Sequence, residues 1–143
     1  MKLLFIPLLV VLCVVCAGCT ASETSHPAAA EVSTNLTGSW VGSLQGYSEG
    51  TGYYDSNNTL TLQVTGQQGR IFNGTMSIVE ADGSTTTRSI AGVIGRDQKS
   101  FTVVQSDTGY DFGTIVSDNE IELVYVTDKD PATVVIDSFK RSS

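Results

Sequence analysis

Hydrophobic and polar residues alternate at every second position through most of the chain from Gly38 onward. Leu60, Leu62 and Val64, for example, are separated by single polar residues. A period of two is typical of a strand that buries one face. No stretch keeps a period of 3.6 residues over three helical turns, so the pattern predicts an all-β domain.

Turn-forming residues divide this pattern at regular intervals. Pairs such as Asp82-Gly83 and Asp118-Asn119 tolerate the positive φ of tight hairpins. The breaks predict eight strands, at residues 38–47, 58–65, 70–80, 84–95, 99–106, 109–117, 119–127 and 132–141. Consecutive strands joined by short turns form an antiparallel meander, which most simply closes into an up-and-down β-barrel without exposed edges. A two-sheet sandwich is the alternative fold.

The apolar phase of the strands identifies candidate interior residues. We expect Leu62, Met76, Ile90, Phe101 and Phe112 to point into the barrel. An eight-stranded barrel is either filled by such side chains or wide enough to hold one small ligand. The pattern leaves both possibilities open.

The N-terminus has the composition of an export signal. Of the first 18 residues 15 are apolar, and Lys2 supplies a short positive region. The apolar run is shorter than the roughly 20 residues of a membrane span and suits a signal peptide. Ala17-Gly18 directly before Cys19 resembles the lipobox of secreted lipoproteins, although Cys16 stands where Leu is usual. The resemblance implies a signal peptide over 1–18 and a lipid on Cys19; alternatives are an ordinary signal peptide cut after Ala21 or a retained anchor.

Residues 19–35 predict a flexible linker between the lipid and a domain over 36–143. The linker lacks an apolar period and contains the only histidine, His26, which we expect to be solvated rather than to bind a metal. The protein would then be tethered to a membrane surface through lipid on Cys19, in an extracytoplasmic, cell-envelope location.

Charge and residue content exclude several functions. Fifteen acidic against eight basic residues argue against nucleic-acid binding, which needs clustered Lys and Arg. The predicted domain contains neither Cys nor His, so Ser-His-Asp and Cys-His catalysis and zinc binding by imidazole or thiolate are excluded there. We expect no metal, no cofactor and no enzymatic activity. Hydrolysis by a carboxylate pair stays open, although most acidic residues of the C-terminal half are expected at turns or on the outer face of strands. These acidic residues are Asp107, Asp111, Asp118, Glu120, Glu122, Asp128 and Asp130.

The first predicted strand opens with Gly38-Ser39-Trp40, which resembles the Gly-x-Trp opening strand of calycins, the superfamily of lipocalins and avidins. Phe72 to Met76 also resembles the third strand of avidin-type barrels. The resemblance implies that Trp40 plugs one end of the barrel and packs on a basic side chain of the last strand, for which Lys140 and Arg141 are the candidates.

The chain departs from both calycin families directly after Trp40. Avidin-type biotin sites have a polar residue there and several further tryptophans, whereas this chain has Val41 and Gly42 and no second tryptophan. Lipocalins usually have an aromatic or basic residue at the position of Val41. Biotin binding is therefore not expected.

The longest predicted connection, Ser48 to Asn58, is the candidate mouth of a ligand site. Five aromatic residues are the candidate ligand-binding residues, three at this connection and two on a possible second wall: Tyr47, Tyr53, Tyr54, Tyr110 and Phe112. The alternative is that the tyrosines only cover the barrel rim.

Three Asn-x-Ser/Thr sites, at Asn35, Asn57 and Asn73, match the glycosylation acceptor pattern, and Asn73 is predicted to point outward.

Three functions follow from the sequence as hypotheses. The barrel binds a small, mostly apolar ligand, or it is a ligand-free envelope or docking module, or it is a carboxylate-dependent hydrolase.

Overall fold

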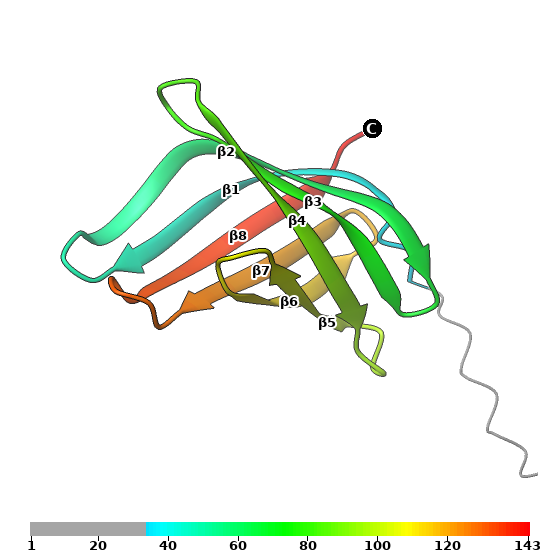
Figure 1. Cartoon of the computed structure of the whole chain (residues 1–143). Coiled ribbons are helices and arrows are strands. Elements are labelled where there is room, and N and C mark those ends of the chain that lie inside the picture. The colour runs from blue at the N-terminus through cyan, green and yellow to red at the C-terminus, as the bar shows by residue number, and fades with distance from the viewer. Residues whose placement is uncertain (1–33) are drawn as a thin grey trace, which may run out of the picture.

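The structure is a computed structural model that describes residues 34–143, apart from the side chain of Asn57. Eight antiparallel strands form a closed barrel in which each strand pairs with its sequence neighbours and the last pairs with the first (Figure 1). This confirms the predicted all-β, up-and-down barrel, and the closure rules out the sandwich. The strands are β1 (Gly38–Ser48), β2 (Gly52–Gln68), β3 (Ile71–Val79), β4 (Thr85–Ile94), β5 (Ser100–Gln105), β6 (Tyr110–Ser117), β7 (Glu120–Thr127) and β8 (Thr133–Arg141).

The predicted signal peptide 1–18, the lipidation site Cys19, His26 and most of the 19–35 linker lie outside the described residues. Within residues 34–143, no helix is long and apolar enough to cross a membrane.

The long mouth loop predicted over residues 48–58 is wrong. β2 begins at Gly52, and Ser48 pairs directly with Gly52 across a tight turn. Gly50 and Gly52 both have positive φ, which glycine adopts without steric cost. The alternation of apolar and polar residues did not reveal the first half of β2, because the polar residue Ser56 occupies an inward-facing position there, paired with Leu44 of β1.

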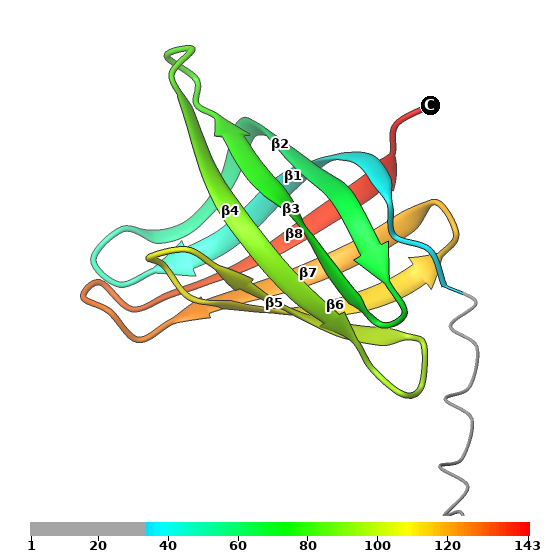
Figure 2. The ribbon, with the colours of Figure 1, turned by 45° about the vertical axis from the view of Figure 1, so that its right-hand side comes forward.

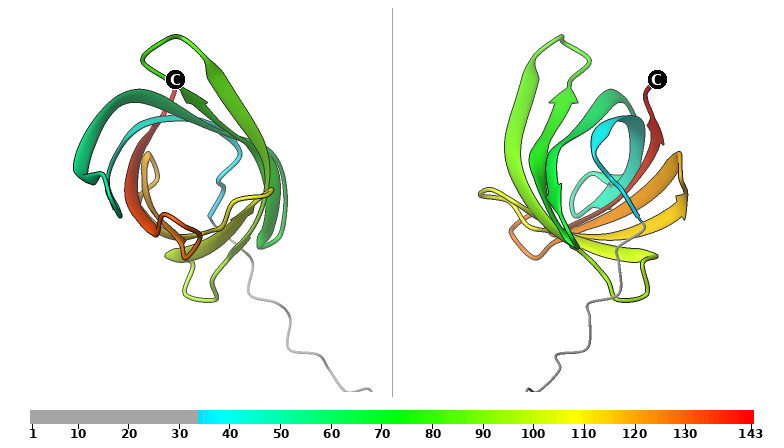
Figure 3. Two further views of the ribbon diagram at one scale, coloured as in Figure 1. Left: turned by 60° about the vertical axis from the view of Figure 1, so that its left-hand side comes forward. Right: turned by 90° about the vertical axis from the view of Figure 1, so that its right-hand side faces the viewer.

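The barrel has two different ends (Figures 2 and 3). The β1–β2, β3–β4, β5–β6 and β7–β8 connections lie at one end, which we call the open end. The other three connections and the segment that precedes β1 lie at the opposite, closed end. That segment crosses the closed end, where Leu36 is buried and its N–H donates to Gln67 Oε1 over 2.9 Å.

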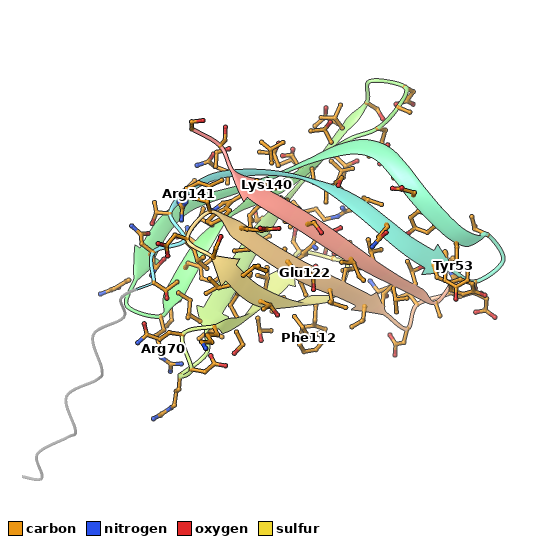
Figure 4. The ribbon with its side chains drawn as sticks, turned by 180° about the vertical axis from the view of Figure 1, so that it is seen from behind. Tyr53, Arg70, Phe112, Glu122, Lys140 and Arg141 are labelled. Atoms are coloured by element: carbon orange, nitrogen blue, oxygen red, sulfur yellow. The ribbon has the colours of Figure 1, made fainter. Side chains whose placement is uncertain are left out.

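Trp40 and Arg141 seal the closed end. The Trp40 indole N–H donates to the Leu36 carbonyl over 2.9 Å, and the Arg141 guanidinium carbon lies 4.0 Å from the Trp40 ring centroid. Arg141 also donates to the Thr37 and Asn35 carbonyls over 2.7 and 2.8 Å. Of the two basic residues proposed from the sequence, Arg141 therefore makes this contact, whereas Lys140 is exposed on the outer face (Figure 4).

Large apolar side chains fill the closed half of the barrel. Phe72 and Phe101 meet edge to face with ring centroids 6.0 Å apart. Each ring lies over a glycine of the adjacent strand: a Cβ on Gly92 would be 2.2 Å from Phe72, and one on Gly113 would be 2.2 Å from Phe101. The small residues thus make room for the large ones.

All eight strands and the whole buried core lie within the 110 residues from 34 to 143. A closed barrel with its own core and no unpaired edge has the features of a domain, so we expect these residues to fold on their own.

Candidate ligand-binding site

The open half of the barrel contains an internal cavity of about 210 Å³. Its apolar walls are Leu44, Leu60, Met76, Ile78 and Val135, and its polar lining is Tyr54, Arg88, Gln105, Thr108, Tyr125, Thr133 and Asp137. Leu60 and Met76 are also part of the core that fills the closed half. The cavity is therefore a cup whose floor is the packed core and whose mouth is the open end.

Asp137 lies deep in this cup. It points inward from β8, between Leu123 of β7 and Leu44 of β1, and is 5% exposed. Its Oδ1 is buried and has no hydrogen-bond partner among the described residues. Burial, and secondly the charge of Asp111, raise the pKa of Asp137 to about 7. The Asp137 carboxyl group therefore lacks at least one hydrogen-bond donor among the described residues.

A second buried carboxyl, Asp111 on β6, is fully satisfied by a neighbour. The Gln105 amide donates to both of its carboxylate oxygens, over 3.0 and 2.8 Å. Burial raises the pKa of Asp111 to about 6, while the hydrogen bonds from Gln105 act in the opposite direction. Asp111 is absent from the cavity lining, because Gln105 lies there instead.

Further polar groups surround Asp137. Burial, then the charge of Asp137 and then Tyr125 raise the pKa of Tyr54, which places Tyr54 within electrostatic range of both the carboxyl and the second phenol. The Thr108 hydroxyl is buried without a partner in the described part of the chain. Arg88, half-buried, contributes a positive charge from β4 on the same cavity.

The sequence-predicted aromatic residues separate into two groups. Tyr54 lines the cavity, whereas Tyr47 and Tyr53 lie on the outer face with their rings edge to face, 5.1 Å between centroids. Tyr53 is 91% exposed at the open end (Figure 4). Tyr110 is exposed on the outer face of β6 as well.

The expectation that Phe112 points into the barrel is wrong, and the adjacent Asp111 faces inward instead. Phe112 points to the outside of the barrel (Figure 4) and is 54% exposed. Asp111 is fully buried. The phase of β6 is set by Gly113, which must face inward because Phe101 occupies the space above it. Its neighbour Phe112 therefore faces out. Among the other interior candidates, Leu62, Met76, Ile90 and Phe101 are buried as expected.

These outward aromatics belong to an exposed apolar strip, which we call the outer apolar face. Across the paired strands β5, β6, β7, β8, β1 and β2 its residues are Val104, Tyr110, Val126, Val134, Tyr47 and Tyr53, with Phe112, Val124 and Ile136 beside them. A shallow groove of about 590 Å³ runs along part of it. The groove is larger than the internal cavity, but the buried Asp137 and Gln105 line the cavity and not the groove.

Four residues of the cavity were not predicted from the sequence, namely Asp137, Gln105, Thr108 and Arg88. A signal was available for Asp137, because it shares the inward phase with Val135 and Phe139. Gln105 likewise follows Phe101 and Val103. A polar residue at an inward position is a candidate ligand contact.

Two further features of the described residues concern modification and metals. Asn35 and Asn73 are both exposed. Within residues 34–143, no three His, Cys, Asp or Glu side chains gather as a metal site would require.

Comparison with known proteins shows the fold. No protein-family model matches the chain, and no curated protein matches it. A redesigned β-barrel is similar in structure with a TM-score of 0.57 and 9% identity, over 76% of this chain and 92% of that chain. A de novo designed fluorescence-activating β-barrel gives a TM-score of 0.48 and 15% identity, over 75% of this chain and 94% of that one.

Proposed function

We propose that this protein is a lipid-anchored, extracytoplasmic barrel of calycin type that binds a small, mostly apolar ligand inside its open half and has no enzymatic activity. The observation that carries the proposal is the internal cavity, whose apolar walls are combined with several inward polar groups, the buried Asp137 among them. Ligand sites in small barrels combine apolar walls with polar groups that orient the ligand. The anchor and the location rest on the signal-like sequence before Cys19.

The arrangement of the two buried carboxyls supports a binding role over hydrolysis. Hydrolysis by a carboxylate pair needs both groups on one substrate. Both oxygens of Asp111 accept hydrogen bonds from Gln105, so that Asp137 is the carboxyl on the cavity.

The test is native mass spectrometry of residues 34–143 isolated gently from the natural host. We expect an additional mass that disappears on denaturation. The variant Val135→Phe, whose ring would fill the cavity, should lose that mass. Its neighbour Val134→Phe, which adds the same volume on the outer face, should retain it. A mass that survives Val135→Phe but is lost in Val134→Phe, or no mass at all, would contradict the proposal.

A second candidate function is docking to a protein partner without a ligand. The outer apolar face favours it, because monomeric proteins rarely expose so much contiguous apolar surface. Cross-linking of the membrane-anchored chain through photoreactive groups at Phe112 would reveal such a partner. Loss of the cross-link in the variant Ile136→Asp, together with no bound small molecule, would favour docking over ligand binding.

A further inference from the structure

The inside of the cup has an unsatisfied, negatively polarised site. Asp137 Oδ1 is buried and unpartnered among the described residues, although the carboxyl lines the cavity directly. A buried polar atom without a hydrogen bond is costly, so its donor must come from the contents of the cavity.

We propose that the ligand of this cavity is a small amine, whose ammonium group binds Asp137 and whose apolar or aromatic body packs against Leu44, Met76 and Val135. This inference rests on the proposed ligand-binding function and specifies its ligand class.

The surroundings of Asp137 favour a cation over a neutral donor. Tyr54 and Tyr125 line the same cavity as the carboxyl, and aromatic rings in a binding site attract an ammonium group. Asp111 adds a second negative charge within electrostatic range of Asp137. An ammonium group would relieve the repulsion between the two carboxyls, whereas a hydroxyl or an amide would not.

The size of the cavity sets the size of the amine. An apolar cavity of about 150 Å³ holds one benzene molecule, and this cup measures about 210 Å³. The additional volume is suitable for a short alkylamine chain attached to one aromatic ring. Phenethylamine therefore has suitable dimensions for a probe, with its ring on the apolar walls and its nitrogen at Asp137.

The charged and titratable groups that face the site come from most strands of the barrel. They are Tyr54 of β2, Arg88 of β4, Tyr125 of β7 and Asp137 itself, and Asp111 of β6 acts on Asp137 from behind Gln105 of β5. Arg88 is the group that would oppose an amine. It does not contribute to the pKa shift of Asp137, which comes from burial and Asp111. Arg88 therefore offers a matched control from the same cavity.

The experiment is isothermal titration calorimetry of residues 34–143 at pH 8 with three probes of similar shape: phenethylamine, ethylbenzene and 3-phenylpropionate. We expect phenethylamine to bind best. The isosteric variant Asp137→Asn should weaken phenethylamine binding about 10- to 100-fold, as for loss of a charged hydrogen bond. It should leave ethylbenzene binding within about threefold, since only the charge is removed. Arg88→Met should retain or improve phenethylamine binding.

A pH series provides a second readout that does not depend on a variant. Below its pKa of about 7, Asp137 is neutral, so phenethylamine binding should weaken from pH 8 to pH 5.5. Ethylbenzene binding should not follow this trend.

Each contrary outcome has a separate meaning. Equal binding of ethylbenzene and phenethylamine, with no effect of Asp137→Asn, would overturn the amine and leave the ligand-binding function standing. If 3-phenylpropionate binds best and its binding is lost in Arg88→Met, the ligand is a carboxylic acid and the amine proposal is overturned. If none of the probes binds, the amine is overturned, and the native mass of the host-isolated protein decides whether the ligand-binding function fails too.

Discussion

Two buried carboxyl groups distinguish the interior of this barrel at the residue scale. Asp111 has its donors supplied by Gln105, whereas Asp137 retains an oxygen without a partner in the described residues. Both carboxyls have pKa values above the usual range because they are removed from water. The protein therefore carries an unfavourable charge at neutral pH in the place where a ligand would be held.

This charge predicts a stability that falls as the pH rises. Between pH 4 and pH 7, folded Asp137 holds a proton that the unfolded chain has released, because its pKa rises from 3.8 to about 7 on folding. The free energy of unfolding then decreases with pH over this window. Asp137→Asn cannot ionise, so at pH 8 it should be more stable than the natural chain by about 2–4 kcal/mol. At pH 4 the two should be nearly equal.

Urea unfolding at pH 4, 6 and 8 measures this effect, with the fluorescence of the buried Trp40 as the probe. Asp55→Asn, which removes an exposed carboxyl of β2, is the matched control and should change stability by less than about 0.5 kcal/mol. A destabilised Asp137→Asn at pH 8 would show that the carboxylate has favourable partners in the folded protein.

At the scale of elements, the closed end joins the segment before β1 to the end of β8. Arg141 of β8 donates to the Thr37 and Asn35 carbonyls, and to the Asp118 carbonyl of the β6–β7 turn over 3.1 Å. It covers the Trp40 ring at the same time. One side chain thus fixes three parts of the chain across this end of the barrel.

Arg141→Gln should therefore destabilise the barrel by about 1–3 kcal/mol, because it removes charged hydrogen bonds and the cation–π contact. Lys140→Gln removes the same charge from the adjacent, exposed position and should have almost no effect. Thermal unfolding followed by circular dichroism measures both variants. Equal losses would mean that net charge, rather than the contacts of Arg141, stabilises this end.

The β3–β4 pair depends on a size match between Phe72 and Gly92. A Cβ at position 92 would be 2.2 Å from the Phe72 ring, so Gly92→Ala should cost about 1–3 kcal/mol. Phe72→Leu makes room at the same place. The double variant should therefore lose less stability than the sum of the losses measured for the two single variants. Additive losses in urea unfolding would indicate that the two residues do not share this space.

The alternation of apolar and polar residues predicted the strands well, but it did not predict for every strand which residues face the barrel interior. The period of two identified eight strands and their order, since a half-buried strand has no other simple pattern. On β6, however, apolar Phe112 faces outward and acidic Asp111 inward, because Phe101 on β5 requires Gly113 inside. The neighbouring strands decide which side of a strand faces inward. A shift of one residue in the pairing register moves every side chain of the strand to the opposite face.

The candidate site was harder to predict than the fold for the same reason. The barrel interior near the open end admits polar residues, so Ser56 and Tyr54 did not mark β2 as a strand. The cavity also combines residues from strands far apart in the sequence, such as Arg88 and Asp137. Only the closure of the barrel brings them together.

At the scale of the whole molecule, the barrel is joined to a sequence that predicts a lipid anchor. The described chain begins at the closed end (Figure 2), whereas the residues that line the cavity lie in the open half of the barrel. An anchor before residue 34 would therefore attach at the end away from the mouth. This arrangement leaves the cavity accessible to ligands.

The proposed lipid anchor predicts a specific dependence on Cys19. Cys19→Ala should abolish the lipid on the N-terminal peptide and release the protein from the membrane fraction, because the acyl chains provide its membrane affinity. Cys16→Ala, three residues earlier, should still be lipidated. Cell fractionation and mass spectrometry of the N-terminal peptide measure both. An unmodified N-terminus at Ser22 in the natural chain would instead indicate an ordinary signal peptide cut after Ala21.

The central claim is that a small ligand occupies the interior of the open half, and Met76 tests it most directly. Met76 lines the cavity and is the only methionine of residues 34–143. We expect its ¹³C-labelled methyl signal to shift saturably when phenethylamine or ethylbenzene is added, and to stay unchanged in Val135→Phe. A Met76 signal that neither compound moves, in a protein that carries no bound molecule from its host, would contradict the account.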